Sequence, residues 1–188
     1  MLTPRIQRKV LTGKILIHPT ESCFGLGCHP KNINALKKIL IIKKRSKNKS
    51  FLLISDKVQK FFRYVSLSEK NLQHISDWPK HTSYLFKKNL RSPMLLSPKK
   101  EKIGCRIPDH KKIKRTLENL NFPITSTSAN FSGQISLKFW RHCCRKFSSK
   151  SCIIMNERVG NYKRPSTIID FETKKIIKIG RASCRERV

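Results

Sequence analysis

The stretch KILIHPTESCFGLGCHP, residues 14–30, is the most informative part of the sequence for the fold. Its apolar run 14–18 ends at Pro19, and a short apolar run bounded by a turn residue is typical of a strand. The strand leads into a loop with Gly25 and Gly27, which let backbone N–H groups approach a ligand closely. Ligands of α/β proteins usually bind at such strand ends. The pattern indicates a binding loop, although an ordinary turn explains it about as often.

Outside this stretch, the sequence alternates between short strands and helices. Ile33, Leu36 and Leu40 recur at helical spacing, with lysines on the opposite face. The predicted helices are 32–44, a segment that starts with the capping-box pair Ser66 and Glu69, a segment from an Asp109 cap to Leu120, and 137–147. The further predicted strands are 51–55, 82–86, 103–107, 122–127, 151–155, 167–171 and 174–177. This order predicts one layered α/β domain.

The composition is strongly basic. The 188 residues include 42 Lys and Arg against 11 Asp and Glu, a net charge of +31. Such a charge favours polyanionic partners such as RNA and nucleotides, but an AT-rich genome would encode the same excess of lysine without selection for binding. The chain has neither an apolar run near the ~20 residues of a membrane span nor a signal peptide. We therefore expect a cytoplasmic protein, with no membrane segment, whose cysteines are free thiols.

The last ten residues, IGRASCRERV at 179–188, look foreign to the rest of the chain. They resemble the conceptual translation of a common sequencing adapter, which would also complete the codon of Lys178. We therefore predict a native domain at 1–178 and a segment at 179–188 that is not native. The basic character of the chain does not depend on this segment, which carries only three arginines.

Two further segments combine groups that can bind phosphate. KKRSKNKS at 43–50 includes an arginine, whose fork matches phosphate oxygens bidentately, although a solvated charge run is the commoner explanation. STSANFSG at 126–133 places four hydroxyls and an asparagine after an apolar strand, where they can bind phosphate or ribose or form a polar turn. No G-x-S-x-G elbow of a serine hydrolase occurs. The cysteine and histidine spacings do not match a zinc site, so we expect no protein metal site.

These three segments, together and in this order, resemble the motifs of the YrdC/TsaC family of threonylcarbamoyl-AMP synthases. The family carries PTE-x-x-x-GLG, K-x-R-x-x-x-K and STSAN-x-SG, which correspond here to 19–27, 43–49 and 126–133. Weaker matches are GCRIPDH at 104–110 and PSTIID at 165–170. The resemblance extends from about residue 13 to 178 and implies the short, single-domain branch, with a twisted mixed sheet flanked by helices.

The resemblance also implies an activity. A nucleotidyltransferase of this family converts L-threonine, bicarbonate and ATP into threonylcarbamoyl-adenylate and pyrophosphate, and Mg²⁺ accompanies the ATP. A TsaD-type transferase with its accessory proteins then uses the product to modify the tRNA adenosine next to the anticodon. Two alternatives remain: a non-catalytic YrdC-like module that binds RNA directly through its basic surface, and a carbamoyl-adenylate enzyme like the YrdC-like domains of hydrogenase-maturation proteins.

The site residues implied by the resemblance fall into two groups. Two anions must be brought together, so positioning and charge neutralisation are the main demands of the reaction. The implied catalytic residues are Lys43, Arg45, Lys49, Ser128 and Asn130, of which Arg45, Lys49, Ser128 and Asn130 also bind ATP. The implied L-threonine site is formed by Thr20, Ser22, Arg106, Ser126 and Ser166, with Arg106 paired to the carboxylate of the amino acid.

This sequence departs from the family pattern at three notable places. His18 replaces the tyrosine or phenylalanine that precedes PTE. The family motif WPGP-x-T corresponds to residues 78–83, where Lys80 and His81 stand in place of Gly-Pro, so we expect a different turn beside the pocket. Lys178 stands at about the position of a family arginine that reaches the nucleotide.

Overall fold

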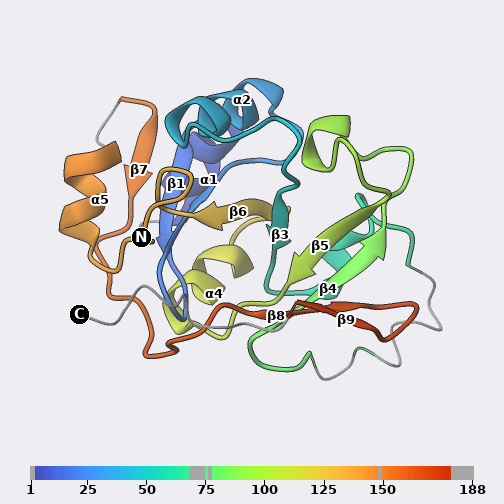
Figure 1. Ribbon diagram of the computed structural model, residues 1–188. Coiled ribbons are helices and arrows are strands. Elements are labelled where there is room, and N and C mark those ends of the chain that lie inside the picture. The colour runs from blue at the N-terminus through green and yellow to red at the C-terminus, as the bar shows by residue number, and fades with distance from the viewer. Residues whose placement is uncertain (1–2, 68–74, 76–77, 148–149, 179–188) are drawn as a thin grey trace.

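The computed structural model describes residues 3–67, 75, 78–147 and 150–178, which form one α/β domain (Figure 1). Within these residues, nine strands form one sheet in the order β7-β1-β2-β6-β3-β5-β4-β8-β9. The sheet is mixed, since β1 runs parallel to β7 but antiparallel to β2. The predicted fold class, a single α/β domain with a mixed sheet flanked by helices, is confirmed. Residues 179–188 lie outside the described residues, so the boundary at 178 stays a prediction.

The elements are short, and most lie where the sequence indicates. The strands are β1 (Ile15–Pro19), β2 (Phe24–Gly27), β3 (Leu52–Ile54), β4 (Thr82–Lys87), β5 (Lys102–Arg106), β6 (Ile124–Ser128), β7 (Cys152–Ile154), β8 (Thr167–Asp170) and β9 (Ile176–Lys178). The helices are α1 (Thr3–Leu11), α2 (Ile33–Ile42), α4 (Lys111–Glu118) and α5 (Trp140–Phe147), with short 3₁₀ turns η1 (Val58–Phe61) and η2 (Met94–Leu96). None of the described helices has the length and apolar character that crossing a bilayer requires.

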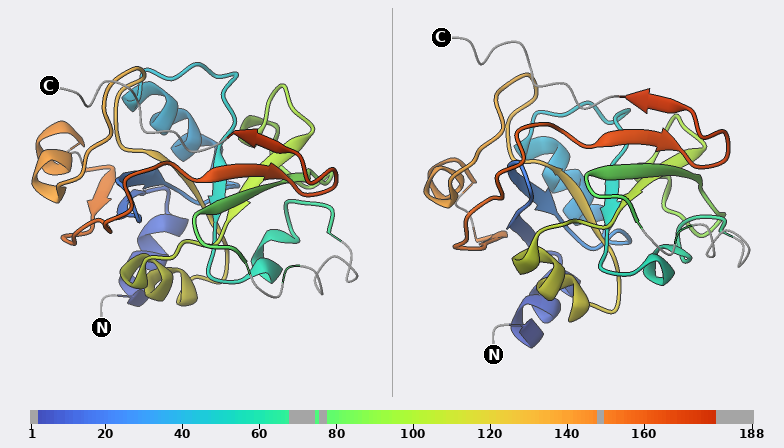
Figure 2. Two further views of the ribbon diagram at one scale, coloured as in Figure 1. Left: turned by 60° about the horizontal axis from the view of Figure 1, so that its bottom comes forward. Right: turned by 90° about the horizontal axis from the view of Figure 1, so that it is seen from below.

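Helices cover both faces of the central strands. Figure 2 shows α2 on one face and α1 beside α4 on the other. Ile15 and Ile17 of β1 belong to the same core cluster as Leu36 of α2, whereas Leu16 packs in a second cluster with Ile113 of α4. Successive strand side chains point to opposite faces, so β1 is buried on both sides.

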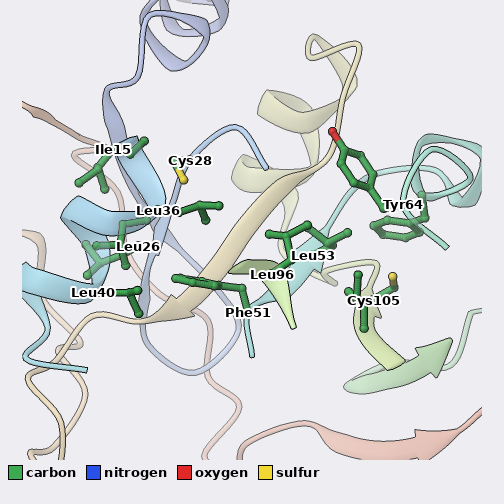
Figure 3. Packing of buried hydrophobic residues seen from close by; sticks show 14 of the residues in the cluster. Ile15, Leu26, Cys28, Leu36, Leu40, Phe51, Leu53, Tyr64, Leu96 and Cys105 are labelled. Atoms are coloured by element: carbon green, nitrogen blue, oxygen red, sulfur yellow. The ribbon is translucent and has the colours of Figure 1, made fainter. Parts of the chain in front are cut away.

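The larger core lies between α2 and the sheet and continues under β3 and β5 (Figure 3). Leu36, Phe51 and Leu53 are buried in it, and Tyr64 and Cys105 extend it away from α2. Burying a side chain of this kind is worth about 1.5–3 kcal/mol. The core therefore holds in place the ends of β1, β5 and β6, from which the predicted site residues emerge.

Residues 24–27, predicted as a glycine-punctuated binding loop, are strand β2 instead. β2 pairs with β1 on one side and with β6 on the other. A Cβ atom on Gly27 would lie 2.3 Å from the Thr125 carbonyl oxygen, and one on Gly25 would lie 2.7 Å from the imidazole carbon Cε1 of His18. The two glycines therefore permit close packing within the protein rather than approach to a ligand.

The predicted cap of α4 is also wrong. The backbone N–H of Asp109 donates to the Glu21 carboxylate, and His110 occupies the N-cap position without a side-chain cap bond. The helix predicted at 137–147 is α5, which begins at Trp140 and buries Cys143 and Phe147. The helix predicted to begin with Ser66 and Glu69 falls largely on 68–74 and 76–77, outside the described residues. The expected free thiols are present at Cys23, Cys28, Cys105, Cys143 and Cys144.

Candidate active site

Lys43 ends α2 and is held beneath the loop that follows β6. The helix stops because Lys44 takes a left-handed backbone conformation, φ 49°, which lets the Arg45 N–H donate to the Leu40 carbonyl oxygen. The Lys43 side chain is buried, with only 2% of the residue exposed. Burial, with a smaller effect from the charge of Arg45, lowers the pKa of the Lys43 ammonium to about 8.

The ammonium of Lys43 donates three hydrogen bonds to this loop. Its acceptors are the carbonyl oxygen of Ser128, the carbonyl oxygen of Asn130 at 2.7 Å and the side-chain Oδ1 of Asn130 at 3.1 Å. The Ser128 hydroxyl also donates to Asn130 Oδ1, at 2.6 Å, and the Ser132 N–H donates to the Lys43 carbonyl oxygen at 2.9 Å. The structure thus brings together three of the five predicted catalytic residues in one network. The catalytic role of Lys43 stays a prediction, since its donors face the loop.

Arg45 and Lys49 lie in the segment that follows α2. Arg45 Nη2 donates to the carbonyl oxygen of Ser50 at 2.8 Å, and its guanidinium lies 5.8 Å from the centre of the Phe51 ring. Arg45 Nε is buried and has no hydrogen-bond partner among the described residues. Burial lowers the pKa of Arg45 from its ordinary value. Lys49 is exposed, as are Lys44 and Lys47, so this segment offers one partly buried and three solvated cations.

Glu21 and Arg106 form a buried ion pair between the end of β1 and the end of β5. Arg106 Nη2 lies 2.8 Å from Glu21 Oε2, and 11% and 4% of the two side chains are exposed. This pair is not aligned as a hydrogen bond, so Glu21 Oε2 has no hydrogen-bond partner within the described part of the chain. The buried Arg106 Nε has none there either. Arg106 already faces a carboxylate of the protein. Its predicted pairing with a substrate carboxylate stays a prediction.

The other predicted threonine-site residues lie near the same strand ends, but they do not all contact one another. The Thr20 hydroxyl donates to the Cys23 carbonyl oxygen at 2.7 Å and closes the turn that contains Ser22. Ser126 Oγ lies 3.4 Å from Nε2 of the buried His18. Ser166 Oγ lies 2.9 Å from the hydroxyl of Ser83, a neighbour on the β4 side of the molecule. Ser166 is therefore hydrogen-bonded to Ser83 and to none of the other predicted threonine-site residues.

His18 is neutral and fixes its own tautomer. Its Nδ1 lies 3.2 Å from the Pro19 carbonyl oxygen, which can only accept, so Nδ1 carries the proton. Nε2 is then the acceptor for the Ser126 hydroxyl. Burial lowers the pKa of His18 to about 4. The histidine that replaces the family's aromatic residue thus acts as a neutral, hydrogen-bonding core side chain.

A cleft of about 370 Å³ opens beside these strand ends. Among its described lining residues, Ser22 and Ser128 belong to the predicted site, and none is acidic. The full lining is Ser22, Cys23, Ser128, Gln134, Ile135, Ser136, Lys138, Lys163, Arg164, Pro165 and Lys178. Four of these side chains are cationic, so the cleft suits an anionic ligand. Larger hollows lie elsewhere, one of about 530 Å³ between α1 and α4, but none of the predicted site residues lines them.

Sequence reasoning missed several of these groups. Glu21 lies inside the PTE motif but was not assigned to the site, although it is one of only 11 acidic residues in the chain. Lys138, Lys163 and Arg164 line the cleft from segments distant in sequence. The signal that could have pointed to the last two is their position directly before PST. No group of three or more metal-ligating side chains is found among the described residues.

Comparisons with known proteins agree with this architecture. The family described as Sua5/YciO/YrdC, telomere recombination, matches residues 8–183. A threonylcarbamoyl-AMP synthase of Neisseria meningitidis serogroup B is 34% identical over 187 residues, which cover 93% of this chain and 98% of the relative. The crystal structure of P. abyssi Sua5 complexed with L-threonine matches with a TM-score of 0.82 and 22% identity, over 94% of this chain. The crystal structure of E. coli YciO matches with a TM-score of 0.78 and 22% identity, over 98% of this chain and 91% of that chain.

The lengths compared differ between these relatives. This chain spans nearly the whole of the Neisseria protein but 53% of the P. abyssi Sua5 chain. At 22% identity, the two solved structures establish the fold alone.

Proposed function

The chain belongs to the Sua5/YciO/YrdC family, and we propose that it is a threonylcarbamoyl-AMP synthase. It joins L-threonine, bicarbonate and ATP into threonylcarbamoyl-adenylate, with release of pyrophosphate and water. The named synthase of N. meningitidis, 34% identical over nearly its whole length, supports this activity. The structural observation that carries the proposal is the cleft beside Ser22 and Ser128, whose charged lining is entirely cationic within the described residues.

The chemistry demands a site that assembles anions. The amino group of threonine first takes up the carbon of bicarbonate, which forms the C–N bond of a carbamate and releases water. A carbamate oxygen then attacks the α-phosphorus of ATP, and the bond to the β-phosphate breaks as pyrophosphate leaves. Both reactants of the second step are negatively charged, so cations that neutralise the triphosphate and hold it in line supply most of the catalysis.

The proposed nucleotide site uses the loop held by Lys43. Ser128 and Asn130 contact phosphate oxygens, and Arg45 and Lys49 neutralise the charge that builds on the leaving pyrophosphate. Lys43 acts from beneath: its ammonium fixes the backbone of residues 128 and 130 and adds a buried positive charge behind them. Lys163 and Arg164 line the cleft beside Ser128. Mg²⁺ enters with ATP as part of the substrate, because the described lining offers no carboxylate.

The proposed threonine site lies around the end of β1. Thr20, Ser22, Ser126 and Ser166 supply hydroxyls, and Arg106 pairs with the carboxylate of the amino acid. A guanidinium has five donors in a fixed fork, so Arg106 can use one edge for Glu21 and another for a substrate. P. abyssi Sua5, a protein of the same fold, was crystallised in complex with L-threonine.

The proposed product serves the modification of the tRNA adenosine next to the anticodon. A TsaD-type transferase with its accessory proteins is the proposed recipient, and the cytoplasm, which holds tRNA and ATP, is the proposed location. This role fits a small enzyme that hands a reactive adenylate to a second protein.

A second candidate function, direct RNA binding, is favoured by one surface. A groove of about 530 Å³ between α1 and α4 is lined by four basic side chains and by Glu157, which pairs with one of them, Lys112, at 3.2 Å. The other three are Arg5, Lys9 and Arg115, and Lys111 and Lys114 extend this basic surface along α4. Phosphate contacts made by such side chains lose affinity steeply with salt. Binding of unfractionated tRNA should therefore collapse between about 50 and 200 mM salt, and charge reversal at Lys114 and Arg115 should flatten this dependence.

The synthase activity is tested by pyrophosphate release from ATP and bicarbonate, with and without L-threonine. The proposal expects release that requires threonine and is lost in an Arg45→Ala, Lys49→Ala variant. A Lys37→Ala, Lys38→Ala variant is the matched control, because both lysines are exposed on α2 away from the cleft. Wild-type protein that releases no pyrophosphate with threonine, yet binds tRNA in the salt-dependent way described above, would favour the RNA-binding function instead.

A further inference from the structure

One wall of the cleft is a segment without regular secondary structure. Residues 163–165 of this segment line the cleft, and Ser166 follows directly. The segment is attached at its start to the end of β1: the N–H groups of Gly160 and Tyr162 donate to the carbonyl oxygens of residues 20 and 21, at 2.9 and 3.0 Å. A Cβ atom at residue 160 would lie 2.9 Å from the carbonyl oxygen of residue 21, so this approach is close.

An aromatic stack joins the same segment to the turn before β4. The ring of His81 lies on the ring of Tyr162, with 3.6 Å between centroids and 3° between planes. His81 has a left-handed backbone conformation, φ 57°, and its carbonyl oxygen accepts the Thr167 N–H at 3.0 Å. The stack and this hydrogen bond thus tie both ends of residues 162–167 to one turn.

This turn is where the sequence departs from the family motif WPGP-x-T. The motif has proline at the position of His81, and a proline ring holds φ near −65°. A backbone with φ 57° is open to histidine but closed to proline, and of the two only histidine offers an aromatic ring to stack. The substitution therefore brings a contact that the family motif cannot make.

We propose that His81 is a positioning residue: through its stack on Tyr162 it holds residues 160–166 in place as a wall of the cleft. This inference depends on the proposed function only for its kinetic consequence. An aromatic pair of this kind shifts a local equilibrium by about 2- to 10-fold. Loss of the stack should therefore increase the open population of the segment by up to that factor, without unfolding the domain.

The direct test is amide hydrogen exchange at Gly160 and Tyr162, whose N–H groups donate to the carbonyl oxygens of the two residues that follow β1. The informative variants are His81→Asn, which tolerates the left-handed backbone but removes the ring, and Tyr162→Leu. Each should accelerate exchange at the two amides by about 2- to 10-fold, and Tyr162→Phe, which keeps the stacking ring, should leave the rates unchanged. The Met155 N–H, bonded to the Ile17 carbonyl oxygen at 2.9 Å, is the internal reference.

A second surface pair provides the matched control. Phe139 and His142 touch edge to face, with 5.4 Å between centroids, outside the cleft lining. Phe139→Leu should alter neither amide rate. Unchanged exchange in His81→Asn, or an equal acceleration at Met155, would overturn the proposal, because the stack would then hold nothing or merely stabilise the whole fold.

A kinetic measurement tests whether the wall formed by residues 160–166 affects the reaction. His81→Asn should raise the KM for ATP by the factor by which the closed population of the segment falls, with kcat within about twofold of wild type, because only the competent population falls. The protection of the Gly160 and Tyr162 amides gives this population, and a KM that does not rise by the corresponding factor would overturn the assignment of the segment to the cleft. Absence of threonine-dependent pyrophosphate release in wild type would count against the proposed function alone, since the exchange result does not depend on it.

Discussion

The unusual environment of Lys43 makes a sharp prediction about stability and pH. The perturbation is Lys43→Met, which keeps the volume of the buried chain but removes the titrating group. In the folded protein the Lys43 pKa is lowered to about 8, whereas an unburied lysine has a pKa of 10.5. Between these two values the unfolded chain binds one more proton than the folded chain. The free energy of unfolding must therefore rise with pH across this window in wild type, relative to the variant.

The size of this effect follows from the pKa shift. Each pKa unit corresponds to 1.36 kcal/mol, so the wild-type free energy of unfolding should gain about 3 kcal/mol on the variant between pH 8 and 10.5. Below pH 8 both states of wild type hold the proton, and the difference between the proteins should be constant. The rest of the chain, common to both proteins, cancels in the comparison.

Urea unfolding of both proteins at steps from pH 7 to 10.5 measures this difference directly. Lys37→Met is the matched control, since Lys37 is exposed on the same helix. A wild-type-minus-variant difference that stays flat within about 0.5 kcal/mol would refute the reasoning, because the three loop oxygens would then stabilise the ammonium enough to cancel the cost of burial.

Three further predictions concern the neighbouring strands. Glu21→Gln and Arg106→Met should each cost about 3–5 kcal/mol in urea unfolding, and the double variant should cost less than their sum, because each single change leaves a buried charge unpaired; strictly additive losses would contradict this. Gly27→Ala should lower stability by at least ~1–3 kcal/mol, since the added methyl meets the Thr125 carbonyl oxygen; an unchanged melting temperature would count against it. The His18 pKa of about 4 implies that wild type loses up to about 3 kcal/mol as pH falls from 6.5 to 4, because the unfolded chain then binds the extra proton; His18→Phe should remove this loss, and equal acid sensitivity of both proteins would exclude it.

The alternation of strands and helices was predictable because it depends on local periodicity. Of the three residues at helical spacing in α2, Leu36 and Leu40 lie in the core as predicted, whereas Ile33, at the start of the helix, is exposed. The segment 24–27 was not predictable in this way. Its two glycines are the usual sign of a turn, and their real cause, the close approach of Thr125 and His18, exists only once β1, β2 and β6 are paired.

The candidate site shows the same division. Ser128, Asn130 and Lys43 were expected together from their motifs, and the structure joins them through hydrogen bonds. The partner of Arg106 was not expected, because Glu21 lies 85 positions earlier and reaches it only through the order of the strands.

The sequence by itself determined the α/β class, the family motifs and the basic charge, since each is a property of residue type and spacing along the chain. Only the tertiary structure decided which charges meet and which are buried. Folding removes Lys43 from water and sets it under the loop of residues 128–130, and it stacks His81 on Tyr162 across the turn where the family motif is altered. Burial and contact between distant segments depend on the packed sheet, and no local pattern of residues encodes them.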